Sequence, residues 1–169
     1  MPMESFATKF RDVACREMRI LTITEHDTLP GGEYGFLEFY CNEAGCDCRR
    51  VVLRVVRPDT GARVWASINF GWESAAFYRR WSPRDPDSAI MVGATLDPFN
   101  PQSQYADALL DLFREMVRED PGYVTRLARH YRMFKGPGPA SATDHDAQAE
   151  SPLEGGSDDT DSCIVPTSV

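Results

Sequence analysis

Three of the five cysteines, Cys41, Cys46 and Cys48, lie within eight residues in the spacing C-x4-C-x-C. In a reducing compartment, thiolates this close are better explained by one shared metal ion than by disulfides. Zinc takes four ligands in a tetrahedron, with zinc–sulfur distances near ~2.3 Å, and a loop containing Gly45 can curl three thiolates about one ion. The motif therefore predicts a structural zinc site with these three ligands.

The fourth zinc ligand has several candidates. We expect His130 to be this ligand, because it lies one position from the apolar stripe of the last predicted helix and could reach the sheet. A lone histidine beside an apolar face is also often a core residue, so Cys15, just before the first predicted strand, is the next candidate. The others are His26, Cys163, His145, Asp47 and water. A water ligand would leave the site open for catalysis.

Two arginines, Arg49 and Arg50, follow the last cysteine of the motif directly. Their positive charge could offset the net −1 of zinc with three thiolates and one imidazole, or the −2 of a four-thiolate site. A neighbouring arginine could also lower a thiol pKa and favour a nucleophilic cysteine. Three adjacent thiols nevertheless favour metal binding over nucleophilic chemistry.

The elements around this motif follow from hydrophobic periodicity and turn residues. We expect strands at 17–24, 35–41, 50–57 and 63–70, and a further extended segment at 89–96. Helices are expected at 73–81, at 103–119 with Ser103 as its cap, and from Pro121 to 135. The pattern predicts an α+β fold, in which an antiparallel β-meander of four to five strands packs against a C-terminal helical hairpin. The cysteine loop joins two of the meander's strands.

Composition divides the chain into a domain, 1–135, and a tail, 136–169. The tail is rich in Gly, Pro, Ser and Asp, so we expect it to be disordered. It holds seven acidic residues and no Lys or Arg, whereas the domain has 19 acidic against 18 basic residues. The net charge of −8 therefore belongs almost wholly to the tail.

Location and partners are less closely defined by the sequence. No segment has the roughly 20 apolar residues of a membrane span, and the N-terminus lacks an apolar signal core, so we expect a cytoplasmic protein with reduced thiols. A basic edge on the last helix, formed by Arg126, Arg129, Arg132 and Lys135, could touch phosphates. A solvated helix face explains it better, so a nucleic acid is not the expected partner, while a protein partner stays open.

Two further segments have a structural and a functional interpretation each. Aromatic residues around Trp72, Tyr78 and Trp81 could line a binding pocket, but aromatics at helical spacing are usually core residues. The polar connection 97–104 could be a functional loop, or its prolines could simply fix a turn.

Four segments, GEYGFLEFYCNEAGCDCRRV, INFGWESAAFYRRW, LDPFNPQSQYADALLDLF and RHYRMFK, resemble an uncharacterised bacterial protein family with a YC-x4-CDCR signature. The resemblance covers roughly residues 16–135. It implies a small cytosolic domain with a metal site and carries no activity with it.

Known enzyme motifs, such as a Walker loop, HExxH or GxGxxG, are absent from the chain. The sequence therefore predicts a zinc-binding domain that acts as a binding or adaptor module rather than as an enzyme. The alternatives are a metal-dependent enzyme with an open zinc site and a thiol-based redox or metal sensor.

Overall fold

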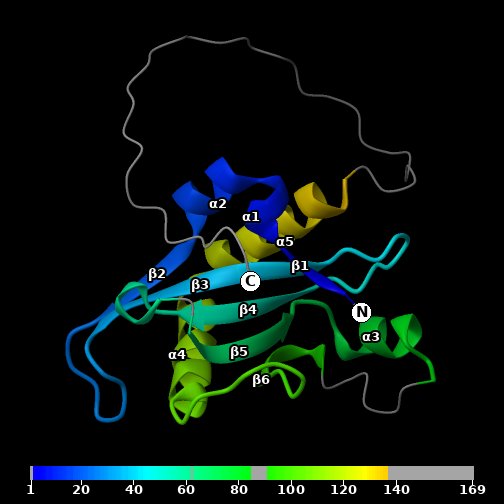
Figure 1. Ribbon diagram of the computed structural model, residues 1–169. Helices are drawn as coiled ribbons and strands as arrows, with labels where there is room; N and C mark the ends of the chain where they lie inside the picture. Colours follow the sequence, from blue (N-terminus) through cyan, green and yellow to red (C-terminus); the bar gives the residue numbers. More distant parts are fainter. Residues whose placement is uncertain (1, 62, 85–90, 137–169) are drawn as a thin grey trace, which may run out of the picture.

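The computed structural model describes residues 2–61, 63–84 and 91–136, and an antiparallel sheet forms its centre (Figure 1). The strands are β1 (Met3–Ser5), β2 (Arg19–Ile23), β3 (Gly32–Cys41), β4 (Arg50–Val56), β5 (Val64–Gly71) and β6 (Gly93–Leu96). Their order is β1-β3-β4-β5-β6, and β2 pairs with the other half of the β3 edge that β1 uses. The predicted meander is thus confirmed for β3, β4 and β5.

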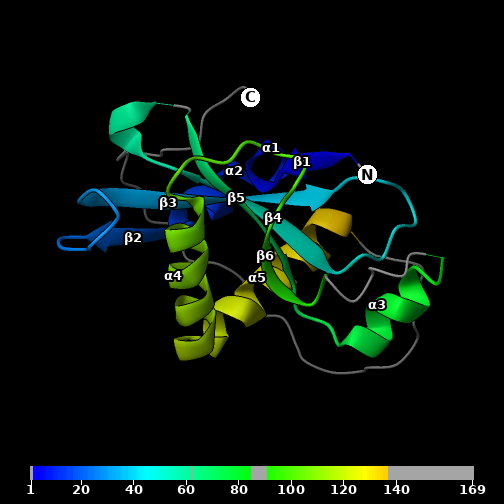
Figure 2. The same ribbon diagram turned by 90° about the horizontal axis from the view of Figure 1, so that it is seen from below.

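Within the described residues, five α-helices accompany this sheet. They are α1 (Phe6–Lys9), α2 (Arg11–Glu17), α3 (Ala75–Trp81), α4 (Ala106–Glu119) and α5 (Pro121–Lys135). The long helices α4 and α5 follow the sheet in the chain and lie on the same side of it (Figure 2). The predicted α+β class, with C-terminal helices against an antiparallel sheet, is confirmed.

The main core lies between this side of the sheet and the two long helices. In β3 and β4 the side chains alternate between the two faces, so every second residue points toward α4 and α5. Residues of this core with no exposed surface include Phe36, Leu53, Ile68, Leu109, Phe113 and Leu127. Their burial positions α5 against the end of β3 where the cysteine loop begins.

The helix boundaries follow local capping. Pro121 stands at the start of α5 as predicted, and the Asp120 carboxylate accepts a hydrogen bond from the Tyr123 N–H, 3.2 Å away. Ser103, the predicted cap of α4, lies before that helix and donates to the Trp65 carbonyl instead, at 2.6 Å. The first three elements, β1, α1 and α2, were not predicted from the sequence.

The polar connection at 97–104 has a structural role. The Gln102 side chain extends the pairing of β5, since its Oε1 accepts from the Ser67 N–H at 3.0 Å and its Nε2 donates to the Ser67 carbonyl at 2.8 Å. The buried Asp97 carboxylate accepts from the Phe99 N–H at 2.9 Å and fixes the turn. The interpretation as a fixed turn accounts for these contacts.

No helix within the described ranges has the length and apolar character to cross a membrane. Apart from Gly136, the predicted acidic tail lies outside the described residues.

Candidate metal centre

The three cysteines of the motif come together at one end of the sheet. Cys41 is the last residue of β3, Cys46 lies in the connecting loop, and Cys48 comes just before β4. Their sulfur atoms all lie within 4.8 Å of one another. Because zinc–sulfur bonds of ~2.3 Å place two tetrahedral ligands about 3.8 Å apart, only a small inward movement would enclose a zinc ion. The predicted convergence of the three thiols is therefore confirmed.

The three thiols differ in exposure. Cys41 and Cys48 are completely buried, whereas Cys46 is half-buried. Burial, together with the neighbouring Cys48 and Cys41, raises the pKa of Cys46 to about 12. Burial and Cys41 also raise the pKa of Cys48, although Arg50 acts in the opposite direction. Without a cation Cys46 and Cys48 are protonated at neutral pH, which argues against an activated nucleophile, and a metal ion would have to displace these protons.

The backbone on either side of Cys46 and Cys48 makes two tight reversals. Gly45 has a φ of 74°, which glycine adopts without steric cost. Arg49 has a φ of 41° and is the one non-glycine residue with positive φ in the described ranges. This conformation costs about 1–2 kcal/mol in an L-residue, so other contacts must hold Arg49 in place.

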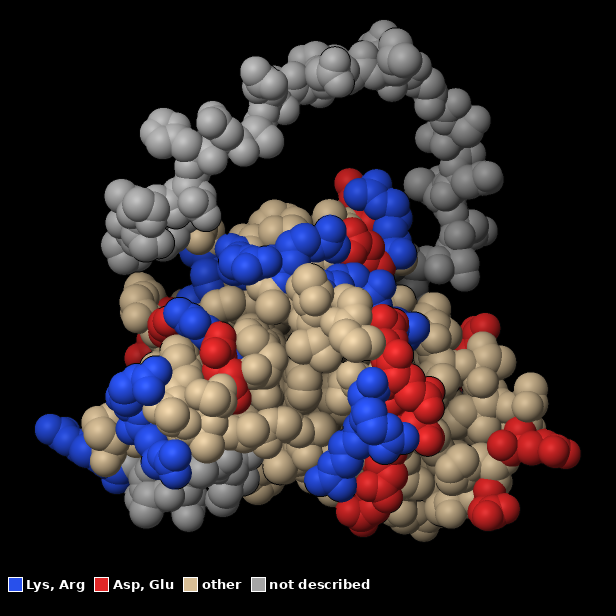
Figure 3. Space-filling view, turned by 180° about the vertical axis from the view of Figure 1, so that it is seen from behind, with Lys and Arg blue, Asp and Glu red and all other residues tan. Residues whose placement is uncertain are grey.

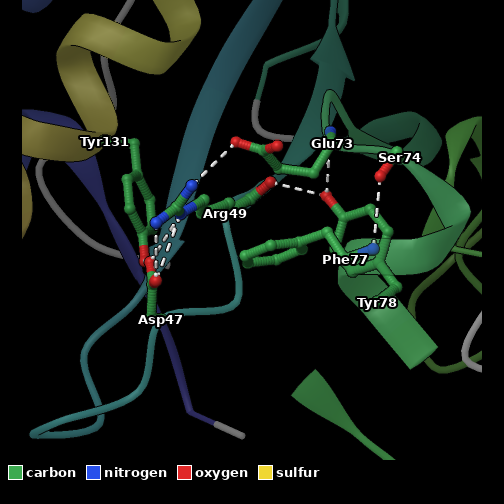
Figure 4. A network of polar contacts seen from close by, with 7 residues as sticks. All are labelled: Asp47, Arg49, Glu73, Ser74, Phe77, Tyr78 and Tyr131. Atoms are coloured by element: carbon green, nitrogen blue, oxygen red, sulfur yellow. Dashed lines mark hydrogen bonds and ion pairs between the residues drawn. The ribbon is translucent and has the colours of Figure 1, made fainter. Parts of the chain in front are cut away.

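Side chains from the loop and from the start of α3 hold Arg49 (Figure 4). Its guanidinium makes ion pairs with Asp47 at 3.0 Å and with Glu73 at 3.1 Å, and its Cζ lies 4.7 Å from the centre of the Phe77 ring. The Tyr78 hydroxyl donates to the Arg49 carbonyl at 2.8 Å. Arg49 thus links the cysteine loop to α3.

The last helix holds the other side of the same loop. The Tyr131 hydroxyl donates to Oδ1 of Asp47 at 3.2 Å. The Lys135 ammonium donates to the carbonyls of Cys41 and Glu43, at 3.1 and 2.9 Å. The loop and α5 are therefore connected through Tyr131 and Lys135, neither of which was predicted from the sequence to contact the loop.

His130 does not join the cysteine group. Its Nδ1 lies 2.7 Å from Oε2 of Glu38, and its Nε2 lies 3.2 Å from Oε2 of Glu17. Its ring also stacks on Phe6, with the ring centres 4.4 Å apart, and is completely buried. Both nitrogens face carboxylates, so His130 acts as a core residue here, and zinc binding by His130 stays a prediction that would require its ring to leave both partners.

The other candidate ligands also lie apart from the cysteine group. Cys15, on α2, is disulfide-bonded and packs against a separate apolar cluster that contains Leu37 and Val52. Nδ1 of His26 accepts hydrogen bonds from backbone N–H groups of its own turn, at 3.0 and 3.1 Å. Asp47 is engaged by Arg49 and Tyr131. His145 and Cys163 lie outside the described residues, and within the described ranges no fourth His, Cys, Asp or Glu completes the group.

The predicted electrostatic role of the two arginines is divided between them. Burial and Cys41 raise the pKa of the Cys48 thiol, and Arg50 partly opposes this rise; Arg50 also donates to Oδ1 of Asn69 at 2.7 Å. The charge of Arg49 is already paired with Asp47 and Glu73, and these ion pairs help to fix the conformation of the loop. Of the two, Arg50 is the better placed to offset thiolate charge.

An open pocket of about 700 Å³ lies beside the loop. Cys46 is the one cysteine of the group that lines it, and Trp72 and Tyr131 supply aromatic surface with ring centres 5.6 Å apart. Of the aromatic residues singled out in the sequence, Tyr78 is buried in the structure, whereas Trp72 is half-buried and faces this pocket.

Comparisons with known proteins identify no relative. The chain matches no protein-family model, and neither the curated proteins nor the solved structures contain a significant match. The family resemblance noted from the YC-x4-CDCR motif therefore has no support beyond the cysteine cluster itself.

Proposed function

We propose that this chain is a zinc-binding domain that serves as a binding or adaptor module, with zinc held by Cys41, Cys46 and Cys48. The observation that carries the proposal is the convergence of three thiols, from one short loop, to within 4.8 Å. Thiolate ligands in a tetrahedral arrangement are typical of zinc. The proposed setting is a reducing compartment such as the cytoplasm, where the thiols remain available for metal.

The proposed role of the metal is to fix the loop between α3 and α5. The loop is already connected to the segment that starts α3 by the ion pair between Arg49 and Glu73. It is connected to the end of α5 by the hydrogen bond from Lys135 to the Cys41 carbonyl. Zinc would add a third connection, within the loop, because its bonds to the three sulfur atoms would link Cys46 to the buried Cys41 and Cys48. The rigid loop then forms one wall of the pocket through which the module binds its partner.

Native mass spectrometry of the purified full chain tests this proposal. We expect one zinc ion per chain and its loss in each of the variants Cys41→Ser, Cys46→Ser and Cys48→Ser. The matched controls, Cys15→Ser and His130→Gln, should keep their zinc. A zinc-free protein would overturn the proposal, and loss of zinc in either control would identify that residue as the fourth ligand.

Thermal unfolding tests whether the metal is structural. We expect a chelator to lower the melting temperature, because a metal ion that binds only the folded chain adds to its stability. An unchanged melting temperature after complete removal of zinc would contradict a structural role.

A metal-dependent enzyme is the second candidate. The specific observation in its favour is that half-buried Cys46 both belongs to the cysteine group and lines the pocket. An open zinc position could then meet a ligand from the pocket. X-ray absorption showing four protein ligands would exclude this candidate.

A further inference from the structure

The pocket beside the cysteine loop has the size of a small-molecule site. Its volume of about 700 Å³ falls within the range of roughly 300–1,000 Å³ that such sites occupy. Its wall comes from three separate parts of the chain, namely the cysteine loop, the segment after β5 and the last two turns of α5. Figure 4 shows Asp47, Arg49, Glu73 and Tyr131 converging there.

The two acidic groups of the pocket share one arginine, so their three charges sum to −1. Both carboxylates in its wall, those of Asp47 and Glu73, form ion pairs with the same arginine, Arg49. Asp47 also accepts the hydrogen bond of Tyr131. Both oxygens of Asp47 are therefore engaged, whereas Glu73 uses only Oε1 in its ion pair.

The basic groups of the pocket are not neutralised in this way. Arg132 is exposed, and no ion pair connects it to another described residue. Lys135 donates to two backbone carbonyls, which leaves its positive charge without a carboxylate among the described residues. Both residues lie in the last turn of α5, where the helix end contributes roughly half a negative charge. Together with the −1 of Asp47, Glu73 and Arg49, the wall keeps a small net positive charge, which is concentrated at Arg132 and Lys135.

The pocket also offers an aromatic platform. Trp72 is half-buried and stands edge-to-face with Tyr131. A planar ring can lie on this surface while an acidic group on the ring reaches the two cations.

We propose that this pocket binds a small aromatic anion, with its ring on Trp72 and its carboxylate or phosphate group at Arg132 and Lys135. The inference rests on the proposed function only because the zinc-loaded loop forms one wall of the site. Figure 3 shows the face of the molecule opposite to that of Figure 1. On this surface Lys and Arg side chains lie close to Asp and Glu side chains. The aromatic wall distinguishes the pocket from such solvated charge.

Titration of the zinc-loaded full chain with 1-naphthyl phosphate and with 1-naphthoate tests the proposal. The readout is the indole N–H signal of Trp72 in a two-dimensional nitrogen–proton spectrum, assigned with the variant Trp72→Phe. Saturable movement of this signal is expected with at least one probe, and the stronger probe shows whether the site prefers a phosphate or a carboxylate. Inorganic phosphate and 1-naphthol, which carry only one of the two features, should bind at least tenfold more weakly.

Variants identify the residues that bind. Arg132→Ala should weaken binding roughly tenfold, as expected for the loss of a hydrogen bond between charged groups. The control Arg118→Ala removes an exposed arginine of α4 and should leave binding unchanged. Equal binding by Arg132→Ala and the native chain, or no movement of the Trp72 signal with either probe, would overturn the proposal.

Failure of this inference is distinguishable from failure of the proposed function. A chain that holds one zinc and binds neither probe keeps its metal function and loses the proposed ligand. A chain that holds no zinc, but whose Trp72 signal responds to a probe, has the pocket without the metal function.

Discussion

At the scale of single residues, Arg49 is the most constrained position beside the metal centre. Its φ of 41° is unfavourable for an L-residue, and its side chain makes contacts with Asp47, Glu73 and Phe77. The side chain is 42% exposed, so each ion pair contributes no more than about 1 kcal/mol. The contacts together still offset a backbone cost of about 1–2 kcal/mol.

A pair of substitutions distinguishes the effect of backbone strain on stability from the effect of the side-chain contacts at this position. Arg49→Ala removes the contacts and keeps the strain, whereas Arg49→Gly removes both. We therefore expect Arg49→Gly to be about 1 kcal/mol more stable than Arg49→Ala in urea unfolding. Equal stability of the two variants would show that Arg49 is not strained in solution.

The cysteines themselves predict a dependence on pH. In the zinc-free chain the folded pKa of Cys46 is about 12, above its ordinary value of 9.0, so the folded state holds this proton more tightly than the unfolded state. Stability from this group is fully present below pH 9 and is lost as the pH rises toward 12. We expect urea unfolding of the zinc-free chain to show this loss between pH 9 and pH 10.5, and Cys46→Ser to reduce it.

Zinc loading should reverse this behaviour. Zinc binds the thiolates and displaces their protons, so the loaded chain should keep its stability at alkaline pH and release zinc on acidification. An alkaline loss of equal size in loaded and zinc-free chains would mean that the titrating groups are not the metal ligands.

At the scale of elements, the cysteine loop depends on α3 on one side and α5 on the other. The contact with α3 requires a residue without a side chain at Gly71, the last residue of β5. A Cβ at this position would lie 2.1 Å from the Met91 carbonyl oxygen and 2.4 Å from the Tyr78 hydroxyl oxygen. Gly71 thus lets Tyr78 reach the Arg49 carbonyl.

Gly71→Ala should therefore be strongly destabilising. We expect a loss of about 3 kcal/mol in urea unfolding, because the backbone carbonyl of Met91 cannot move away cheaply. The control Gly45→Ala meets no atom within 4 Å and should cost only about 1 kcal/mol for its positive φ of 74°. A smaller loss for Gly71→Ala than for Gly45→Ala would refute the close packing of α3.

The contact with α5 can be tested through Lys135. Lys135→Met keeps the length of the side chain and removes the hydrogen bonds to the Cys41 and Glu43 carbonyls. We expect zinc affinity, measured by competition with a chromophoric chelator, to fall at least tenfold, as is common for residues that orient metal ligands. Arg118→Met on α4 is the matched control. An unchanged zinc affinity for Lys135→Met would show that the contact from α5 does not contribute to zinc binding.

At the scale of the whole molecule, the sequence was sufficient for the elements with strong periodicity. The strands β3, β4 and β5 and the helices α4 and α5 each show a regular apolar pattern, and all five are present. The N-terminal elements β1, α1 and α2 have no such pattern. They are held in place by contacts with residues far away in the sequence, such as the pairing of Met3 with Cys41 and the stacking of Phe6 on His130.

The candidate site was predictable to the same extent. The spacing of the three cysteines indicates their convergence, because all three belong to one loop. The surroundings of His130 could not be read from the helix pattern, since its carboxylate partners, Glu17 and Glu38, lie 113 and 92 residues away in the chain. One signal was available, since a charged Glu38 between the apolar Phe36 and Tyr40 needs a buried partner.

The buried carboxylate of Glu38 makes a prediction for the whole fold. Glu38 accepts a hydrogen bond from the Tyr40 hydroxyl at 2.7 Å and faces His130, and this group joins β3 to α5. Since removing one partner of a buried polar pair commonly costs about 3–5 kcal/mol, His130→Ala should lower the free energy of unfolding by an amount of this order. Its zinc content should stay at one ion per chain. A zinc-free but fully stable His130→Ala variant would instead make His130 a ligand.

The central claim, that Cys41, Cys46 and Cys48 hold a zinc ion, is tested most directly by X-ray absorption at the zinc edge of the loaded full chain. The predicted result is three sulfur neighbours at ~2.3 Å and one lighter neighbour, oxygen or nitrogen. A spectrum without three sulfur neighbours would contradict the account.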